Sequence, residues 1–547
     1  MTKRKKRIQK IMSISIQLIL LVAGLCLLAV IVRTAPTTAN KPLPSITAAC
    51  SIGSDNTRAK AIKEAFQHAY NGYRLHAWGS DELLPRSNGS SNSRNGWGAS
   101  IVDGLDTMLI MGLEDEYNEA LEHIAKIDFT RSDTPVKGFE TGIRYLGGLL
   151  AANDLAPNPL LVQKAVELTD NVLLPLFDQS PSKAPLTYMD LKSNEAIMSD
   201  TINLAEFGTY SLEFTRLSQI LGDSKYAAYA NSVVDRALME PTAIPGLFPT
   251  TWDAHTFQPI NSSITTIGGG ADSFYEYLIK NYLLQLDTPT AERDRLLNAW
   301  ITAVESIEKH LATPSQGPVS RIFVASATNE DAKQLQYVSQ ELICFWPGNI
   351  ALGASQISDP KRQQQYWQFA NVFMDACQTV WEKTATGIAP ESWSWSVKSS
   401  EPMIRKRQQS MIRSFAIDSA LYDLRPETIE SIFYFYRMTG DTKYQDIAWS
   451  MFEAINKYTR TPSGFTRITN VDTLDPEQDD FQERQVNHDA IVALPLTPER
   501  TYSYFFAETL KYLYLTFVDK DCISMNDYVF NTEAHPFKLP QSIQVQR

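Results

Sequence analysis

The segments 212–238 (LEFTRLSQILGDSKYAAYANSVVDRAL) and 432–455 (IFYFYRMTGDTKYQDIAWSMFEAI) repeat one pattern. Each has an apolar helical stretch, then Gly-Asp, one further residue, Lys-Tyr and a second helical stretch. A glycine that ends one helix, followed by an aspartate that caps the next, joins two antiparallel helices. The repeat therefore predicts helical hairpins, and repeated hairpins indicate an α/α toroid. A plain helical solenoid is the alternative.

Short extended segments with a glycine follow these hairpins. IPGLFPT surrounds Gly246, TPSGFTR surrounds Gly464, and TATGIAPE around Gly387 resembles a third such unit. They predict short strands at one end of the helical pairs. Because residues 57–536 contain no stretch with the composition of a linker, we expect one large domain.

The charge of the chain is unevenly distributed. Its 547 residues have a formal net charge of −12, yet residues 1–50 contain eight Lys or Arg and no Asp or Glu. The remainder therefore has 42 basic against 62 acidic side chains, a net charge of −20. Such a body repels phosphate backbones, so general nucleic-acid binding is disfavoured.

The N-terminus has the pattern of a signal anchor. Six basic residues within 1–10 precede the uncharged stretch 11–32, whose 22 residues span about 33 Å as a helix. This stretch is longer than the apolar core of a cleaved signal peptide. The basic tail 1–10 would stay cytoplasmic and place the C-terminal body in the lumen. Residues 33–56, rich in Pro, Thr and Ala, predict a flexible lumenal stem before the domain 57–547.

A lumenal body agrees with two sequons and with the cysteines. Asn88 and Asn261 each begin an N-glycosylation sequon. Outside the predicted span, the cysteines stand at 50, 344, 377 and 522. Four cysteines allow three pairings, and spacing alone does not select one of them.

Carboxylates recur at predicted helix starts. In FETGIRYLGGLL (139–150), Glu140 and Arg144 are four residues apart and share a helix face, which a semi-buried salt bridge alone would explain. Asp272 and Glu276 have the same spacing after three glycines, where Asp272 could simply cap a helix. Glu427 falls in a first turn, where the helix dipole favours an ionised general base but acidic residues are common.

Other chemistries lack their motifs. Seven histidines with no HExxH or CxxC cluster disfavour a zinc enzyme, and no GxSxG, GxGxxG or P-loop occurs. Carboxylate chemistry remains, and glycoside hydrolysis is its leading candidate.

The order of several motifs resembles a known family. FETGIRYLGGLL, LAEFGTYSLEF, GGGADSFYEYLIK, LICFWPGNIALG, TGIAPES, LRPETIESIFYFYRMTGD, FFAETLKYLY and YVFNTEAHP occur in this order within residues 60–536. They resemble the class I α-1,2-mannosidases, glycoside hydrolase family 47. The resemblance implies an (α/α)7 barrel with short β-hairpins, a bound Ca²⁺ and exo-acting, inverting removal of α-1,2-linked mannose from high-mannose N-glycans. With the signal anchor, it implies a type II membrane protein of the Golgi or endoplasmic reticulum, whose catalytic domain we expect to be monomeric.

The resemblance also implies residue roles. Glu140 would be the general acid, acting through a water, and Glu427 the base that activates the attacking water; Asp272 would be a third catalytic carboxylate, with acid assistance left open. Thr532 in NTEAHP would bind Ca²⁺ through its oxygens. The acidic residues that would hold waters and sugar hydroxyls are Glu206, Glu276, Glu391, Glu430, Glu508 and Glu533.

Further positions follow from the same resemblance. Arg144 and Arg425 would orient neighbouring carboxylates, and Cys344 and Cys377 would form the family disulfide, which leaves Cys50 and Cys522 paired or free. Inversion requires an acid–base separation of about 6.5–9.5 Å.

Three positions bear on subtype or depart from the family. Glu341 stands where many members have His, and Tyr502-Ser503-Tyr504 stand where an acidic residue, Ser and Phe are usual, although Tyr504 can still stack on a mannose ring. Gly270 resembles the Golgi and fungal forms, because endoplasmic-reticulum members have Arg there. Glu341 keeps open a lectin-like homologue that binds mannose glycans in quality control with little turnover.

Overall fold

The computed structural model describes residues 50, 56–288, 290–328, 334–397, 412–478 and 502–540. Residues 49–547 form one compact unit, separate from residues 1–48. Among the described residues, no helix is both long and apolar enough to cross a membrane. The predicted signal anchor, residues 11–32, lies outside the described residues, as does most of the predicted stem.

Helices dominate the described chain. Their bounds are α3 Thr57–His76, α4 Ala99–Asp103, α5 Leu105–Ile110, α6 Glu114–Ile124, α7 Gly138–Glu140, α8 Gly147–Leu155, α9 Pro159–Leu168, α10 Leu174–Asp178, α11 Leu204–Gly208, α12 Ser211–Leu221, α13 Lys225–Leu238, α14 Asp272–Leu284, α15 Thr290–Ser306, α16 Trp346–Ala354, α17 Pro360–Glu382, α19 Glu427–Thr439, α20 Lys443–Tyr458 and α21 Leu510–Phe517. Shorter π or 3₁₀ segments are η1 Thr141–Leu146, η2 Thr169–Leu173, η3 Ile307–Leu311, η4 Glu341–Phe345 and η5 Phe505–Thr509.

The strands are short and pair antiparallel in sheets of two or three. Their bounds are β1 Glu82–Leu84, β2 Gly89–Ser91, β3 Val136–Lys137, β4 Tyr188–Asp190, β5 Glu195–Ile197, β6 Thr201–Asn203, β7 Thr251–Asp253, β8 Ala312–Pro314, β9 Ile322–Val324, β10 Ser326–Ala327, β11 Leu335–Gln336, β12 Val338–Gln340, β13 Ser392–Ser394, β14 Ala416–Ser419, β15 Arg460–Thr461, β16 Gly464–Phe465, β17 Tyr528–Phe530 and β18 Pro536–Lys538.

The repeated segments form the predicted helical hairpins. In the first, α12 ends at Gly222 with φ 67° and α13 begins at Lys225. In the second, α19 ends at Gly440 with φ 68° and α20 begins at Lys443. Glycine adopts this left-handed conformation without steric cost, so it stops one helix and lets the chain reverse. The hairpin prediction is confirmed.

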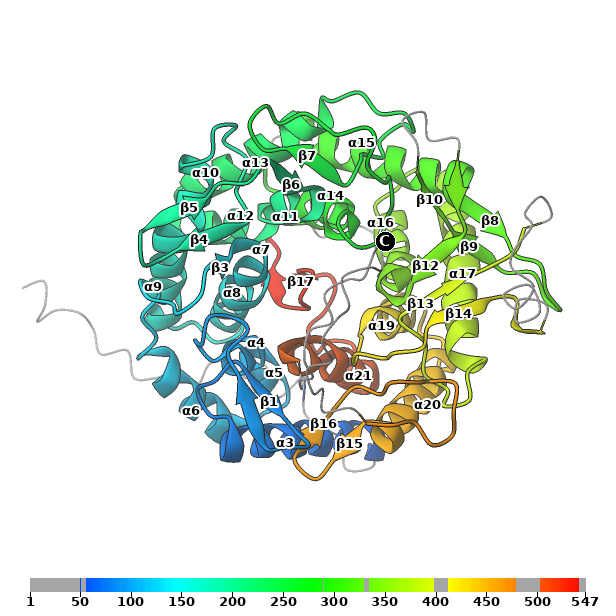
Figure 1. Ribbon diagram of the computed structural model, residues 1–547, viewed down its shortest axis with the longest axis horizontal. Helices are drawn as coiled ribbons and strands as arrows, with labels where there is room; N and C mark the ends of the chain where they lie inside the picture. Colours follow the sequence, from blue (N-terminus) through cyan, green and yellow to red (C-terminus); the bar gives the residue numbers. More distant parts are fainter. Residues whose placement is uncertain are drawn as a thin grey trace, which may run out of the picture. The chain divides into compact units, whose positions relative to one another are not determined.

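The helices of the unit 49–547 follow one another around a ring (Figure 1). The first described helix, α3, packs against α21 near the C-terminus. An open solenoid would keep its first and last helices apart, so this contact favours the toroid. The β17–β18 hairpin, red in Figure 1, lies inside the ring, and its turn carries Thr532 and Glu533.

The predicted strand-like segments differ from one another. The segment TPSGFTR forms β15 and β16, as expected, whereas IPGLFPT makes isolated bridges, from Ile244 to Leu247 and from Pro249 to Thr265. TATGIAPE forms a turn instead of a strand. There the Thr384 hydroxyl donates to the Ile388 carbonyl and accepts from the Gly387 amide. These local bonds replace those that a neighbouring strand would offer.

Two disulfides connect the unit. Cys344 pairs with Cys377, as the family resemblance implied. Cys50 pairs with Cys522 across 472 residues of sequence. Because Cys50 belongs to the predicted stem, this bond ties the end of that segment to the C-terminal part of the domain.

Candidate active site

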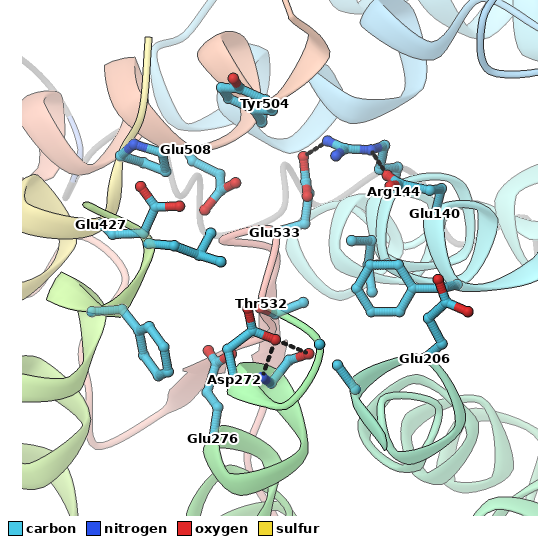
Figure 2. Close-up of a pocket in the computed structure, with 18 of the residues that line it drawn as sticks. Glu140, Arg144, Glu206, Asp272, Glu276, Glu427, Tyr504, Glu508, Thr532 and Glu533 are labelled. Carbon is cyan, nitrogen blue, oxygen red and sulfur yellow. Dashed lines mark hydrogen bonds and ion pairs between the residues drawn. The ribbon is translucent and has the colours of Figure 1, made fainter. Parts of the chain in front are cut away.

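A pocket of about 340 Å³ opens among the elements that carry the predicted site residues (Figure 2). Eight carboxyl groups line it against three cationic side chains, Lys137, Arg144 and Arg425. The carboxyl groups are those of Glu140, Glu206, Asp272, Glu276, Glu427, Glu430, Glu508 and Glu533. Tyr504 and Thr532 also line it. Among the predicted catalytic, metal- and substrate-binding residues, Glu391 alone is not a lining residue.

One wall of the pocket is organised by Arg144. Its Nε donates to Glu140 Oε2 at 2.9 Å, and its Nη1 bonds Glu533 and lies 3.4 Å from Asp103 Oδ2. Arg144 lies in the π-helical segment η1, directly after α7 ends at Glu140. Such segments are frequent at functional sites. The predicted Glu140–Arg144 pairing is present, and it extends to the turn that carries Glu533.

Glu140 is held as a carboxylate. Burial raises its pKa, but Arg94, Arg144 and Lys137 outweigh burial and lower the pKa to about 2. Arg94 Nη2 lies 3.6 Å from Glu140 Oε2. Arg94 was not predicted, because it precedes the motif by some 45 residues and only the fold brings it to Glu140. At neutral pH Glu140 is therefore an acceptor that can orient a water.

The opposite wall is organised by Arg425. Its Nε and Nη2 bind both oxygens of Glu391 at 2.6–3.1 Å, and its Nη1 lies 3.5 Å from Glu427 Oε1. Glu391 thus lies behind Arg425 and fixes its guanidinium. The family resemblance places Glu391 among the acidic residues that would hold waters and sugar hydroxyls. Its contact with Arg425 explains why it does not line the pocket.

Glu427 is the first residue of α19, as the sequence predicted. Burial raises its pKa to about 7, even though Arg425 lowers it. Its Oε2 is buried and has no hydrogen-bond partner among the described residues. A carboxylate with a free oxygen facing a pocket and a pKa near neutrality can accept a proton from a water.

Asp272 begins α14 at the base of the pocket (Figure 2). Its Oδ1 accepts from the Ser273 amide at 2.8 Å. Burial raises its pKa to about 7, and the charges of Glu276 and Glu427 add to the rise. A carboxyl group with this pKa is partly protonated at neutral pH, so Asp272 can supply a proton where Glu140 cannot.

Thr532 faces the pocket between acidic neighbours (Figure 2). Lys280 bonds Glu276 and lies 3.5 Å from Glu430 Oε1, so one buried cation serves two of these carboxyls. Burial raises the pKa of Glu508 and Glu533 well above the usual range; the charge of Glu533 adds to the rise for Glu508, and Asp103 and Glu140 add to it for Glu533. Carboxyl groups outnumber cationic side chains in the pocket, which favours the binding of a cation.

The donor set fits a hard cation that keeps waters. Within the described part of the chain, no group of three or more His, Cys, Asp or Glu side chains is placed to hold a metal directly. The available donors are the Thr532 oxygens and water held by surrounding carboxylates, and Ca²⁺ accepts oxygen ligands of this kind.

Comparison with known proteins agrees with this site. The profile of glycosyl hydrolase family 47 matches residues 65–539. The chain belongs to glycosyl hydrolase family 47. A mannosyl-oligosaccharide α-1,2-mannosidase of Coccidioides posadasii is 37% identical over 524 residues, which cover 91% of this chain and 94% of that protein. The corresponding enzyme of Penicillium citrinum is 36% identical over 514 residues, 89% of this chain and 93% of its own.

A solved family 47 structure has the same fold. The α-1,2-mannosidase from Trichoderma reesei superposes with a TM-score of 0.79 at 32% identity, covering 89% of this chain and all of that one. These relatives are fungal, and they agree with the predicted likeness to the Golgi and fungal type. Gly270 has φ 91°, and a Cβ there would lie 2.8 Å from Asn203 Nδ2, so this backbone does not accommodate arginine without strain.

Glu341, the departure from the family pattern, is buried behind the Glu427 wall. Its Oε1 accepts from Thr428 Oγ1 at 2.6 Å and from Trp381 Nε1 at 3.0 Å. Its Oε2 has no hydrogen-bond partner among the described residues. Burial raises its pKa to about 8, and the charge of Glu427 contributes. In this family 47 chain, position 341 therefore holds a mostly neutral carboxyl group.

The ring of Tyr504 already contacts two other side chains. Tyr502 stacks on it at 4.8 Å with an interplanar angle of 8°, and the Arg144 guanidinium lies 5.6 Å from its ring centre. A sugar that stacks on Tyr504 would compete with these contacts, and such stacking stays a prediction.

Two polar side chains of the pocket, those of Lys137 and Asn203, were not predicted. Lys137, on β3, forms an ion pair with Glu206 at 2.8 Å, and Asn203 caps α11 through its side chain. Lys137 lies only two residues before the FETGIR motif, so its proximity to that motif was an available signal.

Proposed function

We propose that this protein is an exo-acting mannosyl-oligosaccharide 1,2-α-mannosidase, which removes terminal α-1,2-linked mannose from high-mannose N-glycans with inversion. The activity agrees with the relatives' names. The observation that carries the mechanism is Glu427, which lines the pocket on the side away from Glu140 (Figure 2) and whose buried Oε2 has no hydrogen-bond partner among the described residues. Inverting enzymes place a base and an acid on opposite sides of the sugar and leave room for water.

The charges of the two walls support the following proton transfers. Glu427 Oε2 takes a proton from the attacking water, whose oxygen bonds the anomeric carbon as the glycosidic bond breaks. The leaving oxygen takes a proton from a water oriented by the Glu140 carboxylate. Asp272, with a pKa of about 7, can restore that proton. The sum of these steps is hydrolysis, with one proton accepted and one donated.

Calcium completes the proposed site. Thr532 would hold the ion through its oxygens, while Glu276, Glu430, Glu508 and Glu533 hold its waters. When bound, Ca²⁺ supplies positive charge that binds sugar hydroxyls and favours distortion of the ring. Glu276 and Glu533 would remain in place in its absence, because they already pair with Lys280 and Arg144.

We extend the proposal to the whole chain. Residues 1–10 would be the cytoplasmic tail, 11–32 the transmembrane anchor, 33–56 the stem and 57–547 an (α/α)7 catalytic domain in the lumen of the Golgi or endoplasmic reticulum. Both sequon residues, Asn88 and Asn261, are exposed, as glycan attachment requires.

The test is mannose release by the full-length chain in detergent. With Ca²⁺ we expect mannose from an α-1,2-linked disaccharide, with the β-anomer appearing first in NMR spectra and loss of turnover on chelation. Absence of release from both the disaccharide and a nine-mannose glycan would overturn the proposal. Glycan binding without release would instead support the lectin-like alternative. The full chain is used because truncation at residue 57 would remove Cys50, the partner of Cys522.

A further inference from the structure

A three-stranded sheet leads outward from the mouth of the pocket. Its strands are ordered β3–β4–β5, and Figure 1 places β3 beside α7 with β4 and β5 successively farther from the centre of the ring. The register pairs Lys137 with Tyr188 and Tyr188 with Ile197. Side chains of directly paired residues lie on the same face of a sheet. Lys137 lines the pocket, so Tyr188 and Ile197 continue the same face outward.

The two faces of this sheet differ sharply. The residues that alternate with Lys137, Tyr188 and Ile197 lie on the other face and are buried in the core. They are Val136, Met189 and Ala196. Tyr188 and Ile197 keep 41% and 42% of their surface exposed. The buried face holds the sheet in place without help from the exposed side chains. Tyr188 and Ile197 are directly paired across β4 and β5, so they form one exposed apolar pair next to the pocket residue Lys137.

The row of Lys137, Tyr188 and Ile197 is anchored to the pocket by fixed contacts. Lys137 Nζ pairs with Glu206 Oε1 at 2.8 Å, and Thr187 Oγ1, next to Tyr188, donates to Glu206 Oε2 at 3.1 Å. Lys137 Nζ also lies 5.9 Å from the Phe139 ring, which lines the pocket. Glu206 neutralises Lys137, while Asp190 and Glu195, which pair with each other across β4 and β5, place two carboxyl groups on the same face beside Tyr188 and Ile197. This surface suits a ligand that combines hydroxyl groups with apolar C–H faces.

We infer that Tyr188 and Ile197 form an outer subsite that contacts sugar residues of the oligosaccharide beyond the cleaved linkage. The inference rests on the proposed function. A pocket of about 340 Å³ is near the lower end of small-ligand sites, so most of a branched glycan must lie outside it. Ile197 is two strands away from Lys137, which is about 10 Å at the usual spacing between neighbouring strands. The ring of Tyr188 can stack on the C–H face of a pyranose, and Ile197 adds apolar contact.

The test compares a large and a small substrate. We expect Tyr188→Ala to lower the ratio of kcat/KM for a nine-mannose glycan to that for an α-1,2-linked disaccharide by about 3- to 10-fold, the usual value of one aromatic contact. The change should appear in KM for the glycan, because contacts made equally in ground and transition states affect KM alone. Tyr188→Phe should restore the ratio, and Ile197→Ala should lower it less than Tyr188→Ala does.

Leu75→Ala is the matched control, because Leu75 is an apolar side chain 76% exposed at the end of α3. It should keep the wild-type ratio. An unchanged ratio in Tyr188→Ala would overturn the inference, and so would an equal loss on both substrates, which would indicate a structural effect through Lys137. If the wild-type chain releases no mannose from either substrate, the proposed function fails instead.

Discussion

The two walls of the pocket hold the same chemical group and give it opposite properties. Glu140 is half-buried and Glu427 is buried, and the pKa of Glu140 falls to about 2 while that of Glu427 rises to about 7. The cations decide the difference. Three cationic groups act on Glu140, whereas Arg425 beside Glu427 is shared with both oxygens of Glu391. The role of a carboxylate is therefore set by how many cations surround it and what else they bind.

The largest effect should come from the wall with the free oxygen. Glu427→Gln preserves the shape of the side chain and removes the base, so we expect kcat to fall by about 10²- to 10⁴-fold. Turnover of the disaccharide measures this. Glu453→Gln, an exposed change on α20, should leave kcat at the wild-type value. Near-normal turnover in Glu427→Gln would assign the base to another residue.

On the other wall, removal of Arg144 should lower the stability of the folded protein. Arg144→Met leaves the buried Glu533 and Asp103 without the cation that they share with Glu140, which should cost about 3–5 kcal/mol of unfolding free energy. Denaturant unfolding at neutral pH measures it. The control is Arg74→Met, which breaks the half-exposed pair with Glu119 and should cost about 0–1 kcal/mol. Equal losses would show that the buried network adds nothing beyond an ordinary surface pair.

The stability that the carboxyl groups of the two walls contribute should depend on pH with opposite signs. Glu140, whose pKa is lowered in the folded protein, contributes stability above its ordinary value of 4.5, and that contribution is lost as pH falls toward 2. Glu427 and Asp272, whose pKa values are raised, contribute stability at low pH that is lost as pH rises through 7. In Ca²⁺-free buffer, Tm should fall between pH 5 and 8.

Two measurements sharpen this prediction. Ca²⁺ should restore Tm most at pH 8, because a cation favours the ionised carboxylates. The decline of Tm should be shallower in Glu427→Gln, which does not titrate. A Tm that rises steadily from pH 5 to 8 without Ca²⁺ would contradict the raised pKa values of this wall.

The smallest effect should come from Glu341. Since its pKa is about 8, Glu341→Gln imitates the form that dominates at neutral pH and retains an acceptor for Trp381 and Thr428. We expect activity within about 3-fold of wild type at pH 7, because a neutral isostere keeps the geometry of the base. Turnover across pH 6–9 measures it. A large gain in Glu341→His would show that the carboxyl group is a handicap.

Much of the fold was visible in the sequence because its signals are local. Gly222 and Gly440 mark helix ends by their own conformational freedom, and Glu140 and Arg144 meet because they are four residues apart. Arg94 was invisible for the opposite reason, since only packing brings it to Glu140. TATGIAPE resembled a strand in composition, but Thr384 bonds within the segment and Thr386 bonds the Val471 carbonyl. The pairing of Lys137 with Tyr188 likewise depends on the register between β3 and β4, which are some 50 residues apart in sequence.

The sequence by itself determined the helical hairpins, the family and the carboxylates of the site, because glycine stops, helical periodicity and ordered motifs are properties of short segments. Only the tertiary structure decided which carboxylates are ionised, that Glu391 lies behind Arg425, and that Cys50 binds Cys522. These outcomes depend on burial and on distances between residues remote in the chain, and a pKa or an ion pair exists only once those distances are set.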